Sequence, residues 1–272
     1  MIVDTIVTDL DDTLLNENGE ISPYALAVMR ECLNRGVRVI PSSGRAQISM
    51  EPYIRRLQTG FPYIACNGAQ IVNADHTILE MIALPAGFAR EICAFFLERG
   101  AYAQVYRDEY IYYARECEFS AGYRRSSGQK GEAVGDLLGF LTFDTPRVLC
   151  IAEPAMVASL YPEARSLFAG RAACSVSKPY FLEVTPLEAT KGAALKRLAD
   201  RIDIKPKRTF VFGDSLNDLS MFEFTDNSVA MGNARSEVKA AARHICGPNS
   251  EDGMARFVKD KLLADFGEGG EH

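Results

Sequence analysis

The sequence predicts an α/β fold in which a doubly wound parallel sheet carries an inserted α+β domain. Short apolar strand patterns alternate with helical patterns in the first third of the chain and again near its end. This alternation implies a parallel sheet with helices on both faces. The middle of the chain differs, because a hairpin pattern stands among its helices. We therefore expect a discontinuous Rossmann-like core at residues 1–83 and 187–272, and an inserted domain at 84–186.

The first third supplies the clearest pattern. Residues 2–8 are rich in Ile, Val and Thr, which predicts a strand. Ser22-Pro23 predicts the start of a helix, since Ser is a favoured N-cap and Pro fits the first turn. Gly36 predicts the end of that helix. Further strands are expected at 37–41 and 62–66, with a helix between them that ends near Leu57.

The same rhythm returns at the end of the chain. There we expect helices at 190–201, 237–243 and 253–263, and strands at 208–212 and 228–231. In the middle we expect helices at 85–100 and 155–168, a hairpin at 101–114, and strands near residues 148, 175 and 181. The polar stretch 116–135 is interpreted as a solvated loop.

Composition limits the classes of protein. Of 272 residues, 47% are hydrophobic and 24% charged, which is ordinary for a globular protein. The net charge of -6 and the lack of a long Lys/Arg run argue against a nucleic-acid surface. No run of about 18 apolar residues predicts a membrane span, and the start of the chain does not resemble a signal peptide. Seven cysteines without a CxxC pair suggest reduced thiols and a cytoplasmic location. Oligomeric state stays open.

Two acidic clusters follow two of the predicted strands. Asp9 and Asp11 end the first strand, and Asp214 and Asp218 follow a later buried strand. Ligands of open parallel sheets bind beyond the carboxyl ends of the strands, so these side chains should converge. Two like charges 4 Å apart repel by about 4 kcal/mol at an effective dielectric constant of about 20. Such a cluster therefore calls for a cation, and oxygen ligands suit Mg²⁺.

Other residues supply what a phosphate would need at the same edge. Lys191, at the start of a predicted helix, offers a balancing positive charge. Ser43-Gly44 offers a hydroxyl and a backbone N–H at a helix N-terminus, a common anion site.

At these residues the chain resembles the haloacid dehalogenase superfamily, and within it the Cof-like phosphatases with a C2-type α/β cap (subfamily IIB). The resemblance rests on four ordered motifs, and 66–69, 230–234 and 249–253 resemble further signatures of that family. The four motifs are Asp9-Leu10-Asp11-Asp12-Thr13-Leu14, Ser43-Gly44-Arg45, Lys191-Gly192 and 213–218. Two departures are visible: Asp12 replaces the usual Gly, and Ser43 the usual Thr.

The resemblance implies roles for these residues. Asp9 would be the nucleophile and a metal ligand, and Asp11 the acid/base, with its backbone carbonyl on the metal. Asp214 would be the third ligand, supported by Asp218. Phosphate and substrate would be held by Ser43, Gly44, Lys191, Asn217, Arg45 and Asn67. For Arg45 a solvated side chain is an equal alternative, and Asn67 could simply form a turn.

The resemblance implies Mg²⁺-dependent hydrolysis of small phosphate monoesters, such as sugar phosphates, through an aspartyl phosphate. The inserted domain would act as a cap that sets substrate choice. Tyr123, Arg124, Arg125 and Lys130 could touch substrate, but a solvated loop is the simpler interpretation. Three alternatives remain: a sugar phosphomutase, a dehalogenase, and a non-enzymatic phosphate-binding module. The substrate and the role of Asp12 stay open.

Overall fold

The computed structural model describes residues 3–264, so part of the first predicted strand, at Ile2, lies outside the described residues. The chain divides into two compact units. The first comprises the described residues of 1–46, 50–79 and 190–272, and the second comprises 47–49 and 80–189.

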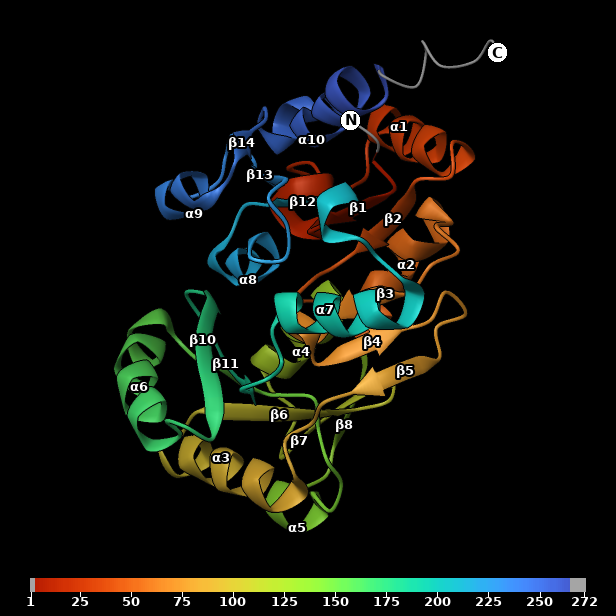
Figure 1. Cartoon of the computed structure of the whole chain (residues 1–272). Helices are drawn as coiled ribbons and strands as arrows, with labels where there is room; N and C mark the ends of the chain where they lie inside the picture. Colours follow the sequence, from red (N-terminus) through yellow and green to blue (C-terminus); the bar gives the residue numbers. More distant parts are fainter. Residues whose placement is uncertain (1–2, 265–272) are drawn as a thin grey trace. The chain divides into compact units, whose positions relative to one another are not determined.

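A five-stranded parallel sheet forms the centre of the first unit (Figure 1). Its strand order is β14-β13-β12-β1-β2, and every pairing in it is parallel. The strands are β1 (Thr5–Thr8), β2 (Arg38–Pro41), β12 (Thr209–Gly213), β13 (Ser228–Ala230) and β14 (His244–Ile245). All four residues of β1 and all five of β12 are buried, as expected for central strands covered on both faces.

Helices cover both faces of this sheet. In Figure 1, α1 (Pro23–Asn34) and α10 (Gly253–Phe257) lie on one side, with α7 (Lys191–Ile202) and α8 (Leu219–Phe222) on the other. The unit also contains α2 (Gln47–Leu57), whose first three residues group with the second unit, and α9 (Ser236–Ala241). Ser22 caps α1 as expected, since its Oγ accepts a hydrogen bond from Ala25 N at 2.9 Å. The predicted doubly wound α/β fold is confirmed.

The third predicted strand differs from expectation. β3 (Tyr63–Ala65) adds to the parallel sheet only through a single bridge between Ser42 and Ile64. It pairs instead antiparallel with β4 (Gln70–Val72), in a three-stranded sheet completed by β5 (Ile78–Met81). The strand propensity of 62–66 predicts the strand but not its partner.

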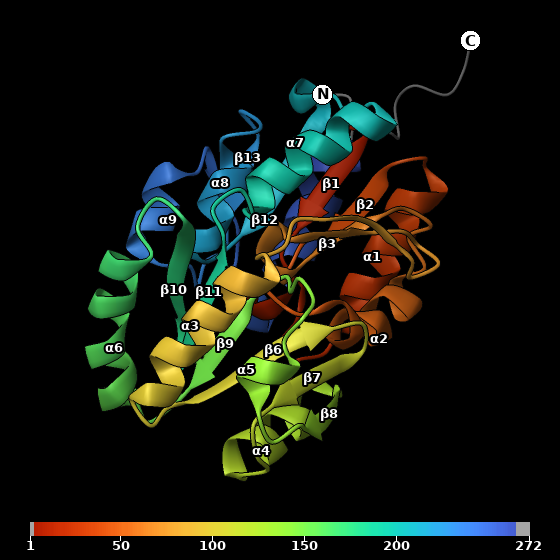
Figure 2. The same ribbon diagram turned by 90° about the horizontal axis from the view of Figure 1, so that it is seen from below.

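The second unit is an α+β domain built on a six-stranded sheet (Figure 2), with strand order β10-β11-β9-β6-β7-β8. Its strands are β6 (Tyr102–Arg107), β7 (Tyr110–Tyr113), β8 (Lys130–Ala133), β9 (Val148–Ile151), β10 (Ala172–Lys178) and β11 (Phe181–Pro186). The helices α3 (Ala86–Glu98) and α6 (Pro154–Leu167) pack on one face, around buried Phe96, Val105 and Leu182. A short helix, α5 (Leu137–Phe140), completes the unit.

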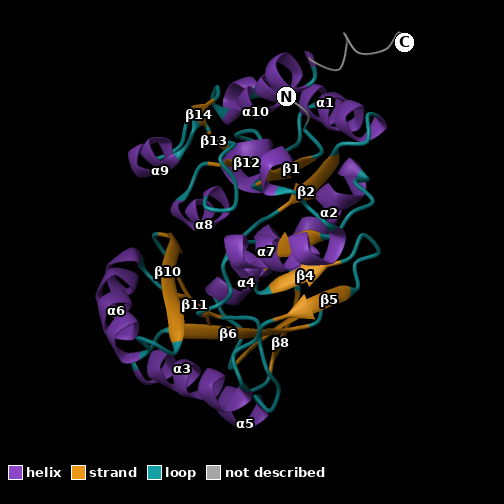
Figure 3. Ribbon diagram, in the orientation of Figure 1, coloured by secondary structure: helices purple, strands orange, loops and turns teal. Residues whose placement is uncertain are grey.

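The interpretation of 116–135 as a loop was wrong. The segment forms α4 (Glu118–Ser127) and the strand β8, as the colours of Figure 3 show. Tyr123 is buried, and its hydroxyl accepts a hydrogen bond from Arg147 Nη2 at 2.9 Å. Arg147 lies 24 residues later in the sequence. The composition of 116–135 alone therefore does not reveal that one of its side chains packs against a distant residue.

One glycine sets the distance between two helices of the first unit. A Cβ added to Gly192 in α7 would lie 1.8 Å from the backbone oxygen of Ser220 in α8. The Gly192 N–H also donates to Ser220 Oγ at 3.0 Å. The two helices therefore meet backbone to backbone at the residue that follows Lys191.

All seven cysteines are free thiols. Within residues 3–264, no helix has the length and apolar character that crossing a membrane requires.

We predict that Gly192→Ala lowers the free energy of unfolding by about 1–3 kcal/mol or more, because the backbone of α8 cannot yield to the new methyl group. The matched control is Gly87→Ala in α3, where the nearest atom is a flexible arginine end at 3.9 Å. That change should be neutral or stabilise the protein by up to about 1 kcal/mol, as Ala favours helices. Urea unfolding measures both variants; equal effects would contradict the close approach.

Candidate active site

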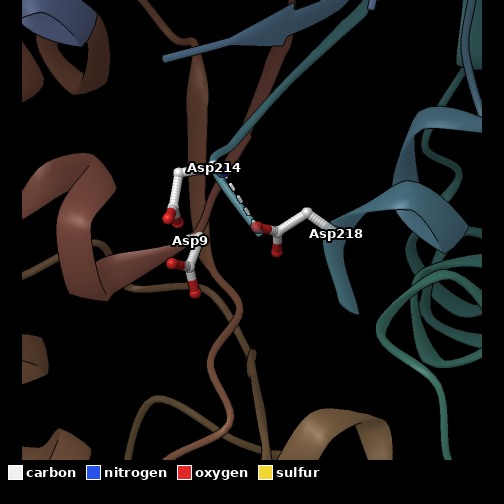
Figure 4. Close-up of side chains that lie close together, drawn as sticks. All are labelled: Asp9, Asp214 and Asp218. Atoms are coloured by element: carbon white, nitrogen blue, oxygen red, sulfur yellow. Dashed lines mark hydrogen bonds between the residues drawn. The ribbon is translucent and has the colours of Figure 1, made fainter. Parts of the chain in front are cut away.

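Three carboxylates meet beyond the carboxyl ends of two neighbouring strands. Asp9 follows β1, and Asp214 and Asp218 follow β12. One carboxylate oxygen from each residue lies within 4.8 Å of the others (Figure 4). The parallel pairing continues to Asp9, whose N–H donates to Phe212 O at 3.1 Å. The expected convergence of Asp9 with Asp214 therefore follows from the register of β1 and β12.

Lys191 is buried among these carboxylates, with only 1% of its side chain exposed. Its Nζ lies 2.6 Å from Asp9 Oδ1 and 2.7 Å from Asp218 Oδ1. The residue begins α7, and Thr190 caps that helix by accepting a hydrogen bond from Ala193 N at 3.1 Å. Burial opposes the charge of Lys191, but Asp218 and Asp9 outweigh it and raise its pKa. The ammonium therefore stays protonated.

Asp218 organises the turn that carries Asp214. Its Oδ2 accepts hydrogen bonds from the backbone N–H groups of Asp214 and Ser215, each at 3.0 Å, and the first is dashed in Figure 4. Lys191 occupies its other oxygen. Gly213 makes room for this arrangement, because a Cβ there would lie 2.5 Å from Asp218 Cβ. Both carboxylate oxygens of Asp218 are thus engaged by other groups of the protein.

The electrostatics of the cluster favour a cation. Burial raises the pKa of Asp214 to about 7, and Asp218 and Asp12 add to the effect. Burial also raises the pKa of Asp9 well above its ordinary value of 3.8, against the opposing charge of Lys191. One lysine does not compensate three carboxylates, of which Asp9 and Asp218 are buried and Asp214 is half-buried. Their hard oxygen donors fit a divalent ion such as Mg²⁺.

The expected convergence of Asp11 with the other three carboxylates was wrong, because the Asp11 side chain lies outside this cluster and pairs with Arg45. Arg45 Nε donates to Asp11 Oδ2 at 2.8 Å, and Arg45 Nη2 donates to Asp11 Oδ1 at 2.6 Å. The carboxylate of Asp11 remains half-exposed, at 51%. Asp11, the predicted acid/base, is thus close to Asp9 in the sequence, but its side chain is held by the guanidinium of Arg45.

The predicted phosphate-binding residues form a connected group. Asn217 Nδ2 donates to Asn67 Oδ1 at 2.8 Å. The Asn67 side chain also lies against Gly44, where a Cβ would be 3.0 Å from Asn67 Oδ1. Ser43 is buried, and its Oγ accepts a hydrogen bond from Arg45 N at 3.1 Å. Asn67 therefore links the motif at 43–45 to the motif at 213–218.

The turn that carries Asn67 also contacts the start of α7, the helix that begins at Lys191. Cys66, Asn67 and Gly68 all have positive φ, at 50°, 54° and 95°, a conformation that non-glycine residues rarely adopt. A Cβ on Gly68 would lie 2.1 Å from the carbonyl oxygen of Thr190. This strained turn is thus pressed against the residue that caps α7. The sequence left open whether Asn67 forms a turn or lines the site; the structure shows that it forms a turn and that its side chain contacts Asn217.

Three residues near the site were missed as individuals by sequence reasoning. Thr13 Oγ1 donates to Asp214 Oδ1 at 3.3 Å. Asn233 Nδ2 donates to Asp12 O at 2.8 Å, and Asn249 Nδ2 donates to Leu15 O at 3.0 Å. All three stand inside segments that resemble family signatures, which was the available signal. They tie the loop after β1 to the C-terminal part of the unit.

Two of the three basic residues of 116–135 form ion pairs within their own unit, and the third, Arg125, is exposed. Arg124 pairs with Glu116, and Lys130 pairs with Glu109 at 2.6 Å. These ion pairs are partly exposed and contribute little to stability.

A largely buried carboxylate cluster that one lysine balances only in part, bordered by a hydroxyl and amides, defines a site for chemistry on an anionic, oxygen-rich group such as phosphate. The chain belongs to the haloacid dehalogenase-like hydrolases, since the model of that family matches residues 6–258.

Known relatives agree with this assignment. HMP-PP phosphatase of Serratia proteamaculans (strain 568) is 28% identical over 263 residues, which cover 95% of each protein. The 5-amino-6-(5-phospho-D-ribitylamino)uracil phosphatase YwtE of Bacillus subtilis (strain 168) is 28% identical, over 95% of this chain and 98% of that protein. The crystal structure of TM0651 from Thermotoga maritima is 30% identical and superposes with a TM-score of 0.86, covering 95% and 97% of the two chains. The predicted family, fold class and phosphatase class are confirmed.

We predict that Mg²⁺ stabilises the protein more at pH 8 than at pH 5. The folded-state pKa of Asp214, about 7, lies above the ordinary value of 3.8. Between these values the folded protein binds more protons than the unfolded chain, so the contribution of Asp214 to stability falls as pH rises. A cation should offset that loss only where Asp214 is ionised.

The measurement is the Tm of chelator-treated protein with and without Mg²⁺ at both pH values. Asp214→Asn is the matched variant, and it should show a smaller Mg²⁺ effect and a weaker pH dependence. A Mg²⁺ shift in Tm that is the same in both proteins would contradict Asp214 as part of the cation site.

Proposed function

We propose that this protein hydrolyses small phosphate monoesters with Mg²⁺ and forms a phosphorylated Asp9 during turnover. The observation that carries the proposal is the burial of Asp9 between Lys191 and two further carboxylates at the strand ends. A purely phosphate-binding module has no need of buried negative charge, since carboxylates repel phosphate. A nucleophile and a cation site do require it.

Asp9 has one carboxylate oxygen engaged and one available. Lys191 donates to Oδ1, while no residue within 3–264 donates a hydrogen bond to Oδ2. We assign Oδ2 to the attack on phosphorus. Lys191 holds the nucleophile in direction and supplies positive charge where the equatorial phosphate oxygens accumulate negative charge, the main source of catalysis in phosphoryl transfer.

The phosphate would be held by groups on two loops. Ser43 and Gly44 lie just before α2, and Asn217 lies in the turn after β12. The hydrogen bond between Asn217 and Asn67 fixes the direction of the Asn217 amide. Asp9, Asp214 and the backbone carbonyl of Asp11 would hold Mg²⁺, which when bound neutralises phosphate charge.

The reaction then has two steps at phosphorus. In the first, Asp9 Oδ2 bonds to phosphorus, the ester P–O bond breaks, and Asp11 gives its proton to the leaving alcohol oxygen. In the second, water bonds to phosphorus, Asp11 takes the proton of that water, and the bond to Asp9 breaks. The products are an alcohol, inorganic phosphate and the starting enzyme, so atoms and protons balance.

The substrate class follows from the relatives and the second unit. Two relatives are named for phosphorylated small metabolites, and we extend that class, including sugar phosphates, to this chain. None of the residues assigned to phosphoryl transfer comes from 84–186. We propose that this insert, with its own α+β fold, acts as a cap that selects the organic part of the substrate, and that the protein acts in the cytoplasm.

We predict that Asp9→Asn abolishes phosphate release while the protein stays folded, because an amide cannot form the acyl phosphate. The measurement is phosphate release from a panel of phosphorylated metabolites, with folding checked by thermal unfolding. Wild-type enzyme quenched with acid during turnover should carry phosphate on Asp9, and the variant should carry none. Normal turnover by freshly purified Asp9→Asn would rule out this mechanism.

We predict that Asp11→Asn lowers kcat by about 10²–10⁴-fold, the usual contribution of a general acid or base. The loss should be greater for an alkyl phosphate than for p-nitrophenyl phosphate, since nitrophenolate leaves without a proton. Mg²⁺ affinity should change little, because the backbone carbonyl remains. If Mg²⁺ affinity collapsed and kcat at saturating Mg²⁺ survived, Asp11 would be a side-chain ligand instead.

A further inference from the structure

Arg45 and Asp11 meet through two parallel hydrogen bonds. The donor–acceptor distances are 2.8 Å from Nε to Oδ2 and 2.6 Å from Nη2 to Oδ1. This paired geometry fixes both the position and the plane of a carboxylate, which a single point charge does not. Within residues 3–264, no other side chain or backbone group makes a hydrogen bond to the Asp11 carboxylate.

Arg45 is itself held at both ends. Its backbone N–H donates to Ser43 Oγ at 3.1 Å, and its backbone carbonyl accepts from Cys66 N at 2.8 Å. Its guanidinium lies 5.0 Å from the ring centroid of Tyr53, a distance typical of a cation–π contact. The Tyr53 hydroxyl in turn donates to Gly19 O at 3.0 Å. The guanidinium is therefore anchored before it meets Asp11.

The sequence left open whether Arg45 contacts the substrate or is solvated. In the structure its guanidinium pairs with Asp11. Asp11 is half-exposed and would otherwise rotate freely, and a misplacement of about 1 Å in a reacting group can cost about 10²-fold in rate. A proton-transfer group on an exposed turn needs such an anchor.

We propose that Arg45 is a positioning residue that acts on the reaction through Asp11, by holding its carboxylate in the direction from which it transfers the proton. The inference rests on the proposed phosphatase mechanism. It assigns Arg45 to the chemical step and not to the grip on the substrate.

The test is a double-mutant cycle in the full-length protein with Mg²⁺. The variants are Arg45→Met, Asp11→Asn and the double variant, each assayed with an alkyl phosphate and with p-nitrophenyl phosphate. Arg45→Met keeps an apolar chain against Tyr53 but removes the two donors. Arg55→Met is the matched control, since Arg55 lies on α2, which follows Arg45 closely, and pairs with Glu51 at 2.8 Å but is 69% exposed.

We expect Arg45→Met to lower kcat for the alkyl phosphate by about 10–100-fold, with KM within about threefold. The loss for p-nitrophenyl phosphate should be smaller. Adding Arg45→Met to Asp11→Asn should cost little more, because the group that Arg45 positions is already disabled. Arg45→Lys, which keeps the charge but loses the paired geometry, should be intermediate and provides a second variant should Arg45→Met fold poorly. Arg55→Met should behave as wild type.

Two results would overturn the inference. If Arg45→Met raises KM and leaves kcat unchanged, or if its effect adds fully to that of Asp11→Asn, Arg45 contacts the substrate directly. These results leave the proposed function intact as long as the wild type turns over and Asp11→Asn turns over more slowly. A wild type without Mg²⁺-dependent phosphate release from either substrate would instead remove the proposed function, and the inference with it.

Discussion

The candidate site depends on the burial of one ammonium group between two carboxylates. Lys191 reaches Asp9 and Asp218 at 2.6 and 2.7 Å with almost no exposure to water. Burying any of these charges alone would cost several kcal/mol, and short hydrogen bonds offset the cost only if all partners are accurately placed. Much of the local architecture can be understood as the means of placing them.

Three glycines illustrate this requirement. A Cβ at Gly68, Gly192 or Gly213 would lie 2.1, 1.8 or 2.5 Å from its nearest neighbour, which is Thr190, Ser220 or Asp218 respectively. Because it has no side chain, Gly68 contacts the start of α7 and Gly192 contacts α8. For the same reason Gly213 contacts Asp218 in the turn after β12. The helix that carries Lys191 is thereby set against the 66–68 turn and against α8, which follows the acidic turn after β12. Thr190 adds the cap that fixes where this helix begins.

Much of this arrangement could be predicted from the sequence, because it depends on local patterns and one topological rule. Alternating strand and helix signals predicted the parallel sheet, and residues after parallel strands share one edge, which placed Asp9 beside Asp214. The pairing of Arg45 with Asp11 could not be predicted, since it depends on two side-chain rotamers 34 residues apart. The packing of 116–135 was missed because Tyr123 is buried against Arg147, which lies 24 residues later, just before β9. The partner of β3 was missed because strand propensity carries no information on pairing.

The two sets of hydrogen bonds made by Asp218 restrict which substitutions this protein can accept during evolution. Its carboxylate serves Lys191 with one oxygen and two backbone N–H groups with the other. Replacing Lys191 alone would leave two buried carboxylates without their cation. Replacing Asp218 alone would leave two backbone N–H groups without an acceptor and Lys191 with only Asp9 as a partner. Each first step is costly even where a compensated pair would be tolerated. Sequence drift should therefore be blocked at this edge of the sheet, while the opposite face of each covering helix remains free to vary.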